Sequence, residues 1–191
     1  KWKYKDGTQT ERDCILQASY ENWDKEHIGS HIIRRCSIHD CGQTGIVGHL
    51  GGVFSIIEDN HIYNINNKQN LAGAEIGGIK MHAAIDVIFR RNRIHHCTRG
   101  IWLDWQAQGT RVTQNLMYDN SLGFDKTRLN SDNVGEFLGS LGEDLFVEVS
   151  HGPTLVDNNI FLSERSIKFA SQGGAFVHNL FAGSLTCIGT G

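Results

Sequence analysis

The chain has one proline, no long hydrophobic run and no strong excess of either charge among its 191 residues. A membrane-spanning helix needs about 20 consecutive apolar residues, and no segment approaches that length. The net charge of −3 gives no electrostatic reason to expect a nucleic acid or an acidic membrane as a partner. One proline and 22 glycines permit many tight turns but lack the signatures of collagen or disorder. The composition therefore indicates one globular domain with a sizeable core.

The cysteines exclude two further classes of protein. Their number is odd, their spacing is irregular, and none forms a Cys-x-x-Cys pair. A disulfide framework and a zinc site are therefore disfavoured, and reduced, partly buried thiols of a cytoplasmic protein are expected. The five are Cys14, Cys36, Cys41, Cys97 and Cys187.

Ten histidines raise the question of a metal site. The adjacent His95 and His96 would point to opposite faces of a strand and could not chelate together. We therefore expect no metal and no cofactor, and turn or surface positions for most histidines. These are His27, His31, His39, His49, His61, His95, His96 and His178.

A short pattern recurs six times along the chain: an apolar residue, two variable residues, Asn or Cys, any residue, and a second apolar residue. Its anchors are separated by 24, 32, 23, 44 and 20 residues. A base period in the low twenties indicates a solenoid, and the two long gaps indicate loop insertions at about residues 64–74 and 121–142. The anchors are Cys36, Asn60, Asn92, Asn115, Asn159 and Asn179.

The segments between the anchors are short and alternate between apolar and polar residues, which is typical of strands with one buried face. No segment sustains helical spacing, and no leucine pattern of a leucine-rich repeat is present. The sequence therefore predicts an all-β fold, a right-handed parallel β-helix, over residues 1–191. An inward Asn in each coil would bond to the Asn above and below, and Cys36 would fill the same slot as a small buried residue.

Aligning one strand of each coil on its inward apolar residues predicts two ladders of outward side chains. Apart from Val47, the first ladder carries basic and aromatic residues; apart from Ala170, the second carries histidines and acids at consecutive coils. The first ladder is Val47, Lys80, Trp102, Phe146 and Lys168. The second is His49, His82, Asp104, Glu148 and Ala170.

Asp104 and Glu148 are the candidate catalytic residues, because the ladder places them on adjacent coils. Parallel strands lie about 4.8 Å apart, so the two carboxyl groups should be roughly 5 Å apart. That separation suits a glycosidase that retains anomeric configuration. Two acids this close do not ionise equally, so one pKa should rise. Trp102, Trp105 and Phe146 beside them predict an exposed aromatic platform for a sugar.

Three motifs carry a resemblance to a known family. They span residues 77–84 (Gly-Gly-Ile-Lys-Met-His-Ala-Ala), 100–111 (Gly-Ile-Trp-Leu-Asp-Trp-Gln-Ala-Gln-Gly-Thr-Arg) and 144–153 (Asp-Leu-Phe-Val-Glu-Val-Ser-His-Gly-Pro). They resemble the catalytic core of glycoside hydrolase family 120, the β-helical β-xylosidases, over roughly residues 20–185. The resemblance implies that Asp104 is the nucleophile and Glu148 the acid/base. It also implies that further coils and a β-sandwich region belong to the full enzyme.

The resemblance further implies that Glu75 and His82 help to hold the sugar, although a surface role for His82 is equally compatible with the ladder alone. Their neighbours on the stacked strands complete the expected sugar site. The expected substrate-binding residues are Glu75, Lys80, His82, Trp102, Trp105 and Gln106.

The preferred interpretation is a retaining β-xylosidase that releases xylose from short xylo-oligosaccharides. Two alternatives stay open: a uronate-acting β-helix lyase or epimerase, for which Lys80 is the obvious cation, and a non-catalytic β-helical carbohydrate-binding or adhesin fragment. Because the chain begins at Lys1 rather than Met, we expect it to lie within a longer protein. A homo-oligomer formed through the missing regions is compatible with the sequence.

Overall fold

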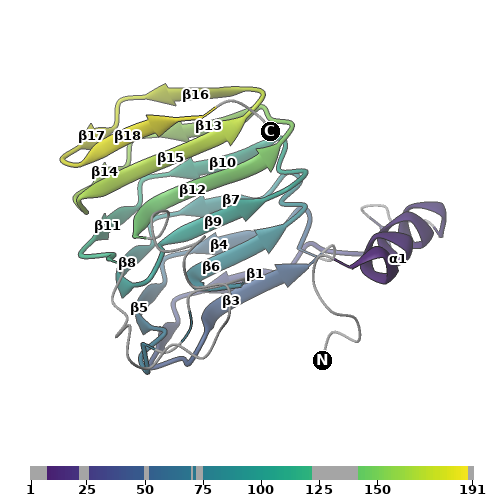
Figure 1. Ribbon diagram of the computed structural model, residues 1–191, viewed down its shortest axis with the longest axis horizontal. Helices are drawn as coiled ribbons and strands as arrows, with labels where there is room; N and C mark the ends of the chain where they lie inside the picture. The colour runs from purple at the N-terminus through teal and green to yellow at the C-terminus, as the bar shows by residue number, and fades with distance from the viewer. Residues whose placement is uncertain are drawn as a thin grey trace.

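The computed structural model describes residues 8–21, 26–49, 52–69, 71, 75–121 and 142–188. From residue 32 onward the chain winds through three parallel six-stranded sheets in turn (Figure 1). Each coil contributes one strand to each sheet, and equivalent strands of successive coils pair in parallel. The predicted right-handed parallel β-helix is confirmed.

The first sheet opens each coil and is called sheet A here. Its strands are β1 (Ile32–Arg34), β4 (Ile56–Glu58), β7 (Ile88–Arg90), β10 (Thr110–Thr113), β13 (Thr154–Asp157) and β16 (Gly174–Val177). Sheet B consists of β2 (Ser37–His39), β5 (His61–Ile65), β8 (Arg93–Cys97), β11 (Leu116–Tyr118), β14 (Ile160–Phe161) and β17 (Leu180–Phe181).

Sheet C closes each coil and carries both predicted ladders. Its strands are β3 (Thr44–His49), β6 (Gly77–His82), β9 (Ile101–Asp104), β12 (Glu143–Ser150), β15 (Arg165–Ser171) and β18 (Ser184–Cys187). The register agrees with the sequence alignment, because Lys80 pairs with Trp102 and Trp102 pairs with Phe146.

The Asn anchors form the predicted ladder at the corner between sheets A and B. Asn92 donates from its side chain to Asn115 Oδ1 at 3.0 Å, and the same oxygen accepts the Asn92 backbone N–H at 2.9 Å. Asn115 repeats both bonds with Asn159, and Asn159 repeats them with Asn179. Each buried Asn side chain therefore hydrogen-bonds to the backbone of the preceding coil and to the Asn side chain of the next coil.

The residue before each anchor adopts the left-handed backbone conformation in all six coils, although none of them is glycine. A non-glycine residue in this conformation lowers the stability of the fold by about 1 kcal/mol or more. Five of the six donate their N–H to a carbonyl one coil along, which helps to offset that cost. The six are Arg35, Asp59, Arg91, Gln114, Asn158 and His178.

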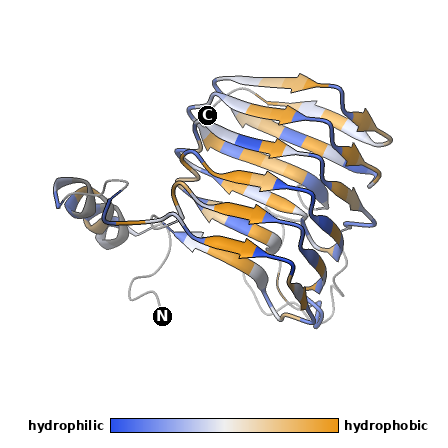
Figure 2. Ribbon diagram, turned by 180° about the vertical axis from the view of Figure 1, so that it is seen from behind, coloured by the Kyte–Doolittle hydropathy of each residue, from blue (hydrophilic) through white to orange (hydrophobic). Residues whose placement is uncertain are grey.

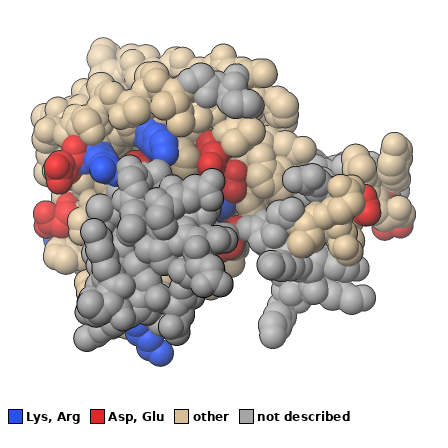
Figure 3. Space-filling model, in the orientation of Figure 1, with Lys and Arg blue, Asp and Glu red and all other residues tan. Residues whose placement is uncertain are grey.

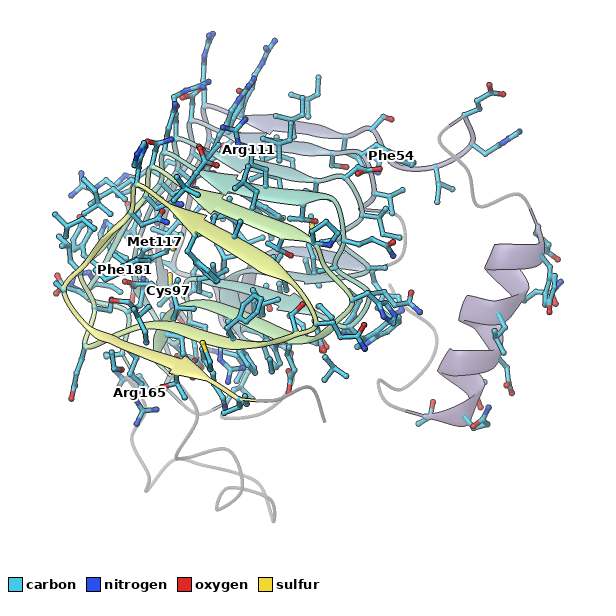
Figure 4. All side chains as sticks on the ribbon, turned by 90° about the horizontal axis from the view of Figure 1, so that it is seen from above. Phe54, Cys97, Arg111, Met117, Arg165 and Phe181 are labelled. Carbon is cyan, nitrogen blue, oxygen red and sulfur yellow. The ribbon has the colours of Figure 1, made fainter. Side chains whose placement is uncertain are left out.

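The core fills the interior of the coils, and apolar residues concentrate in the strands while hydrophilic residues gather in the turns (Figure 2). Seen along the stack of coils, Met117 and Cys97 point inward and Arg111 lies outside (Figure 4). All five cysteines are free of disulfides, and Cys97 is the buried one. Cys36 departs from the prediction: its N–H bonds to Asn60 Oδ1 as the ladder requires, but the residue is exposed because its coil is the first.

The N-terminal part also departs from the prediction, because α1 (Gln9–Tyr20) is a helix. Its sequence has no apolar stripe at helical spacing, and Gln9 bonds instead to Asp13 one turn along at 2.8 Å. In the described residues no helix is long and apolar enough to cross a membrane.

The predicted insertions can be followed only in part. The one at 64–74 begins later than predicted, because β5 continues to Ile65 and a turn follows at residues 66–68. Residues 70 and 72–74 lie outside the described part of the chain. Residues 122–141, nearly all of the second insertion, also lie outside it, so that insertion stays a prediction.

Candidate active site

The two candidate catalytic acids lie on neighbouring strands of sheet C, Asp104 at the end of β9 and Glu148 within β12. Leu103 of β9 pairs with Val147 of β12, so Asp104 and Glu148 occupy the next position on the two strands. On the other side of β9, Asp104 pairs with His82 of β6. The predicted neighbourhood of the two acids is therefore present.

Asp104 sits in a dense set of hydrogen-bond donors. Its Oδ2 lies 2.7 Å from Lys80 Nζ and 2.9 Å from His82 Nε2, while its Oδ1 accepts the Trp105 backbone N–H at 2.8 Å. Burial by itself raises the pKa of Asp104, but the His82 hydrogen bond together with the Lys80 charge and hydrogen bond outweighs it and holds this pKa below its usual value. Asp104 therefore loses its proton more readily than an ordinary aspartate.

Glu75 reaches the same group from the turn before β6. Its Oε1 lies 3.5 Å from both Lys80 Nζ and His82 Nε2. The Thr44 hydroxyl donates to the Glu75 carbonyl, which holds this turn against β3. One cation and one histidine are thus shared between two carboxylates, and the Lys80 and His82 side chains are 1 and 2% exposed.

Glu148 has the opposite electrostatic environment. Burial and the negative charge of Asp104 raise the pKa of Glu148, against the lowering effect of Arg99, Trp102 and Lys80. Trp102 Nε1 donates to Glu148 Oε2 at 3.0 Å. The pKa values of the two carboxyl groups thus shift in opposite directions, which lets neighbouring acids take different roles in one reaction.

The expectation of an exposed aromatic platform is wrong for two of its three rings. Trp102 and Phe146 are only 4 and 3% exposed. Trp102 carries Lys80 Nζ 3.5 Å from its ring centroid and stacks on Phe146 at 5.7 Å, and Lys168 Nζ lies 4.8 Å from the Phe146 centroid. Alternation along the strand predicted that these rings point outward, but it could not show that they pack against cations in a column.

The remaining predicted sugar contacts lie in the turn after β9. Trp105 is half-buried and stacks on the His82 ring at 4.7 Å between centroids. Gln106 follows in a left-handed conformation and is also half-buried. The structure therefore brings Glu75, Lys80, His82 and Trp105 together around Asp104 and places Gln106 two residues beyond it.

Sequence reasoning missed two participants. Arg99 Nε lies 2.8 Å from Glu143 Oε2 in a buried ion pair, and its guanidinium carbon lies 4.1 Å from the Trp102 centroid and 4.4 Å from that of Phe146. Arg99 and Glu143 each stand two positions before the first inward residue of their strands. Opposite charges at equivalent repeat positions were the signal that could have revealed this pair.

His49 is the second missed participant, because a surface role was expected for it. Its Nδ1 lies 2.7 Å from Nδ1 of His82, and its ring meets the Trp105 ring edge-on. The surface expectation for His49 is therefore wrong. Its place directly before His82 in the predicted ladder was the available signal.

The visible charged side chains on the face drawn in Figure 3 are of both signs. Acidic and basic side chains lie close together on the face shown in Figure 3, rather than in separate fields of one sign. Among the residues that the structure describes, no three His, Cys, Asp or Glu side chains converge as they would around a metal ion.

Comparison with known proteins gives two matches. The family described as "right handed beta helix region" matches residues 21–184. A solved structure, described as the complex of XylC with xylose, is 50% identical to the chain, with a TM-score of 0.75. The match covers 92% of this chain but 25% of that one, so the chain spans about a quarter of the length of XylC. No curated protein matches the chain. The chain belongs to the right-handed β-helix family, and the resemblance of its motifs to glycoside hydrolase family 120 is confirmed by its likeness to XylC.

Proposed function

We propose that this chain carries the catalytic pair of a retaining glycosidase that acts on β-xylosides. The observation that carries the proposal is the position of Asp104 and Glu148 on adjacent paired strands, with opposite pKa shifts. Equivalent positions on such strands place the carboxyl groups roughly 5 Å apart. Retaining enzymes have this separation, whereas inverting enzymes need roughly 6.5–9.5 Å to admit a water.

The opposite pKa shifts support one assignment of the two roles. Ionised Asp104 attacks the anomeric carbon while Glu148, with its raised pKa, gives its proton to the departing glycosidic oxygen. Glu148 then removes a proton from water, the water oxygen bonds to the anomeric carbon, and the bond electrons return to Asp104. Asp104 Oδ1 accepts the Trp105 N–H, whereas Oδ2 accepts from both Lys80 and His82, so Oδ1 is better suited to form the covalent bond.

The sugar contacts follow from the groups that border Asp104. Trp105 offers a half-buried aromatic surface, and Glu75, His82, Lys80 and Gln106 offer polar atoms for hydroxyl groups. Trp102 instead positions Glu148 through its indole N–H. Xylose is the favoured sugar because XylC, 50% identical to this chain, was solved with xylose. Short xylo-oligosaccharides are the proposed substrates.

The uronate-acting alternative loses its main support. It needs a cation that is free to neutralise a carboxylate of the substrate, but Lys80 is buried and already lies 2.7 Å from Asp104. A catalytic role accounts better than a purely binding role for two adjacent acids with opposite pKa shifts.

The test is hydrolysis of an aryl β-xyloside by the intact protein, with the first-formed anomer observed by proton NMR. Xylose should appear first as the β-anomer, and a 2-deoxy-2-fluoro-xyloside should label Asp104, as read by mass spectrometry of peptides. The aryl α-xyloside serves as the control and should not react. First release of the α-anomer, a label on another residue, or an unsaturated uronate product from pectic substrates would overturn the proposal.

A further inference from the structure

His49 lies beside the catalytic region without touching either acid. In the β3–β6 pairing His49 stands opposite His82, one coil before it. The two rings meet edge-on, with centroids 4.8 Å apart, and their Nδ1 atoms are 2.7 Å apart. His82 Nε2, on the opposite side of its ring, is 2.9 Å from Asp104 Oδ2. The three side chains thus form a continuous line of hydrogen bonds across three coils.

The chemistry of Asp104 decides which nitrogen of His82 carries a proton. An ionised carboxylate only accepts hydrogen bonds, so His82 must donate from Nε2. Lys80 Nζ, 3.3 Å from that nitrogen, is a second donor to the same Asp104 oxygen. Glu75 Oε1, 3.5 Å away, is a further acceptor on this side. The two carboxylate oxygens near Nε2, Asp104 Oδ2 at 2.9 Å and Glu75 Oε1 at 3.5 Å, therefore favour the form of His82 that carries a hydrogen there, whereas the Lys80 ammonium directs its hydrogen to Asp104.

His49 interacts with the other ring nitrogen of His82, Nδ1. When His82 is neutral with its proton on Nε2, its Nδ1 holds a lone pair and needs a donor, which is His49 Nδ1–H. The bond at 2.7 Å is then satisfied, and His82 presents Nε2–H to Asp104.

We propose that His49 is a positioning residue that fixes the tautomer and ring orientation of His82, so that Nε2–H always faces Asp104. The inference rests on the proposed glycosidase function. When the bond between Asp104 and the anomeric carbon breaks, its electron pair returns to the carboxylate, and His82 Nε2–H and Lys80 meet that charge. Without His49, His82 could place its proton on Nδ1 and turn a lone pair toward Asp104, which would oppose the returning charge.

Two matched substitutions separate this role from packing. His49→Phe keeps an aromatic ring beside Trp105 but removes the donor and acceptor, whereas His49→Gln keeps a polar group that can donate and accept. We expect kcat on xylo-oligosaccharides to fall about 10- to 100-fold in His49→Phe and to stay within about threefold of the unmodified protein in His49→Gln. An equal loss in both variants would overturn the proposal.

The direct readout is nitrogen-15 NMR of the His82 ring, which does not depend on catalysis. The unmodified protein and His49→Gln should show the Nε2–H tautomer, and His49→Phe should show a mixture of tautomers. If the Phe variant does not fold, the scalar coupling between the two Nδ1 atoms across the hydrogen bond decides in the unmodified protein. Absence of that coupling, or a His82 tautomer indifferent to His49, would overturn the proposal even if the protein hydrolyses xylosides. The His82 tautomer could instead depend on His49 in a protein that does not hydrolyse xylosides. That result would refute the proposed function, and with it the role of His49 in catalysis.

Discussion

The indole N–H of Trp102 donates to Oε2 of Glu148 at 3.0 Å, from one strand of sheet C to the next. This bond ties the proposed acid/base to a ring that is itself held between Lys80 and Phe146. A hydrogen bond donated to a carboxylate stabilises its charged form. Trp102 therefore both orients Glu148 and limits the rise of its pKa.

Replacing Trp102 with Phe should shift the basic limb of the pH profile for kcat/KM to higher pH. The variant removes the N–H donor, so the pKa of Glu148 should rise further and its acid form should persist to higher pH. Phe146→Leu is the control, because it disturbs the same column without removing a donor to Glu148. The same shift in both variants would attribute the effect to packing and contradict the prediction.

Replacing Asn115 with Ala should lower the free energy of unfolding by about 3 kcal/mol. Asn115 is buried, and its amide serves the Asn92 backbone and side chain, the Phe89 carbonyl and Asn159 Oδ1. Deletion leaves several buried polar groups without partners.

Asn179→Ala is the matched control for that substitution. Asn179 makes equivalent bonds to Asn159 and the Val156 carbonyl, but it is half-exposed, so water can replace part of what is lost. Its cost should be about 1 kcal/mol. Urea unfolding measures both free-energy changes. Equal losses would show that burial does not determine how much each Asn of the ladder contributes to stability.

The sequence predicted the ladders because side-chain direction alternates along a strand and the repeat fixes which strands are neighbours. These two rules were enough to place Asp104 beside Glu148 and His82. They do not reveal what packs over an outward residue, so the burial of Trp102 and Phe146 was missed. They also do not give the rotation of a ring, so the approach of His49 to His82 could not be seen.

The helix α1 was missed for a different reason. Prediction relied on an apolar stripe, and residues 9–20 have none, so no periodicity marked the helix. Local pairs such as Gln9 with Asp13 stabilise a helix only weakly and leave no pattern of buried residues in the sequence.

The buried Asp144 should make the stability of the fold depend on pH. Burial raises its pKa from 3.8 to about 6, against hydrogen bonds from Ser163 and Asn120. A folded-state pKa above the unfolded one gives a stabilising contribution that is complete below the unfolded pKa and is lost as pH rises through the folded pKa. This contribution should fall by about 3 kcal/mol between about pH 3.5 and about pH 7.

Asp144→Asn isolates that contribution, because the amide does not titrate in this range. The difference in unfolding free energy between the unmodified protein and Asp144→Asn should decrease across the interval and be level above it. The absolute cost of the substitution does not matter, since only its change with pH is read. A difference that is constant, or that grows with pH, would contradict the raised pKa.

Azide should distinguish the roles of the two acids in the intact protein. With Glu148→Ala, an aryl xyloside with a good leaving group can still form the covalent intermediate, because departure of that group needs no protonation. Hydrolysis then stalls without the base, and azide can enter the vacated space and release the β-azide. With Asp104→Ala no covalent intermediate forms, and azide attacking from the nucleophile's side should give the α-azide.

On substrates with poor leaving groups, each truncation should lower kcat/KM by about two orders of magnitude or more. Glu143→Gln is a useful comparison. Glu143 is a buried acid on the same strand as Glu148, but it pairs with Arg99 and is proposed neither as nucleophile nor as acid/base. The Glu143→Gln variant should give no azide product of either configuration. The β-azide from Asp104→Ala and the α-azide from Glu148→Ala would reverse the assignment, because the configuration of each product reports which face of the sugar lost its carboxylate.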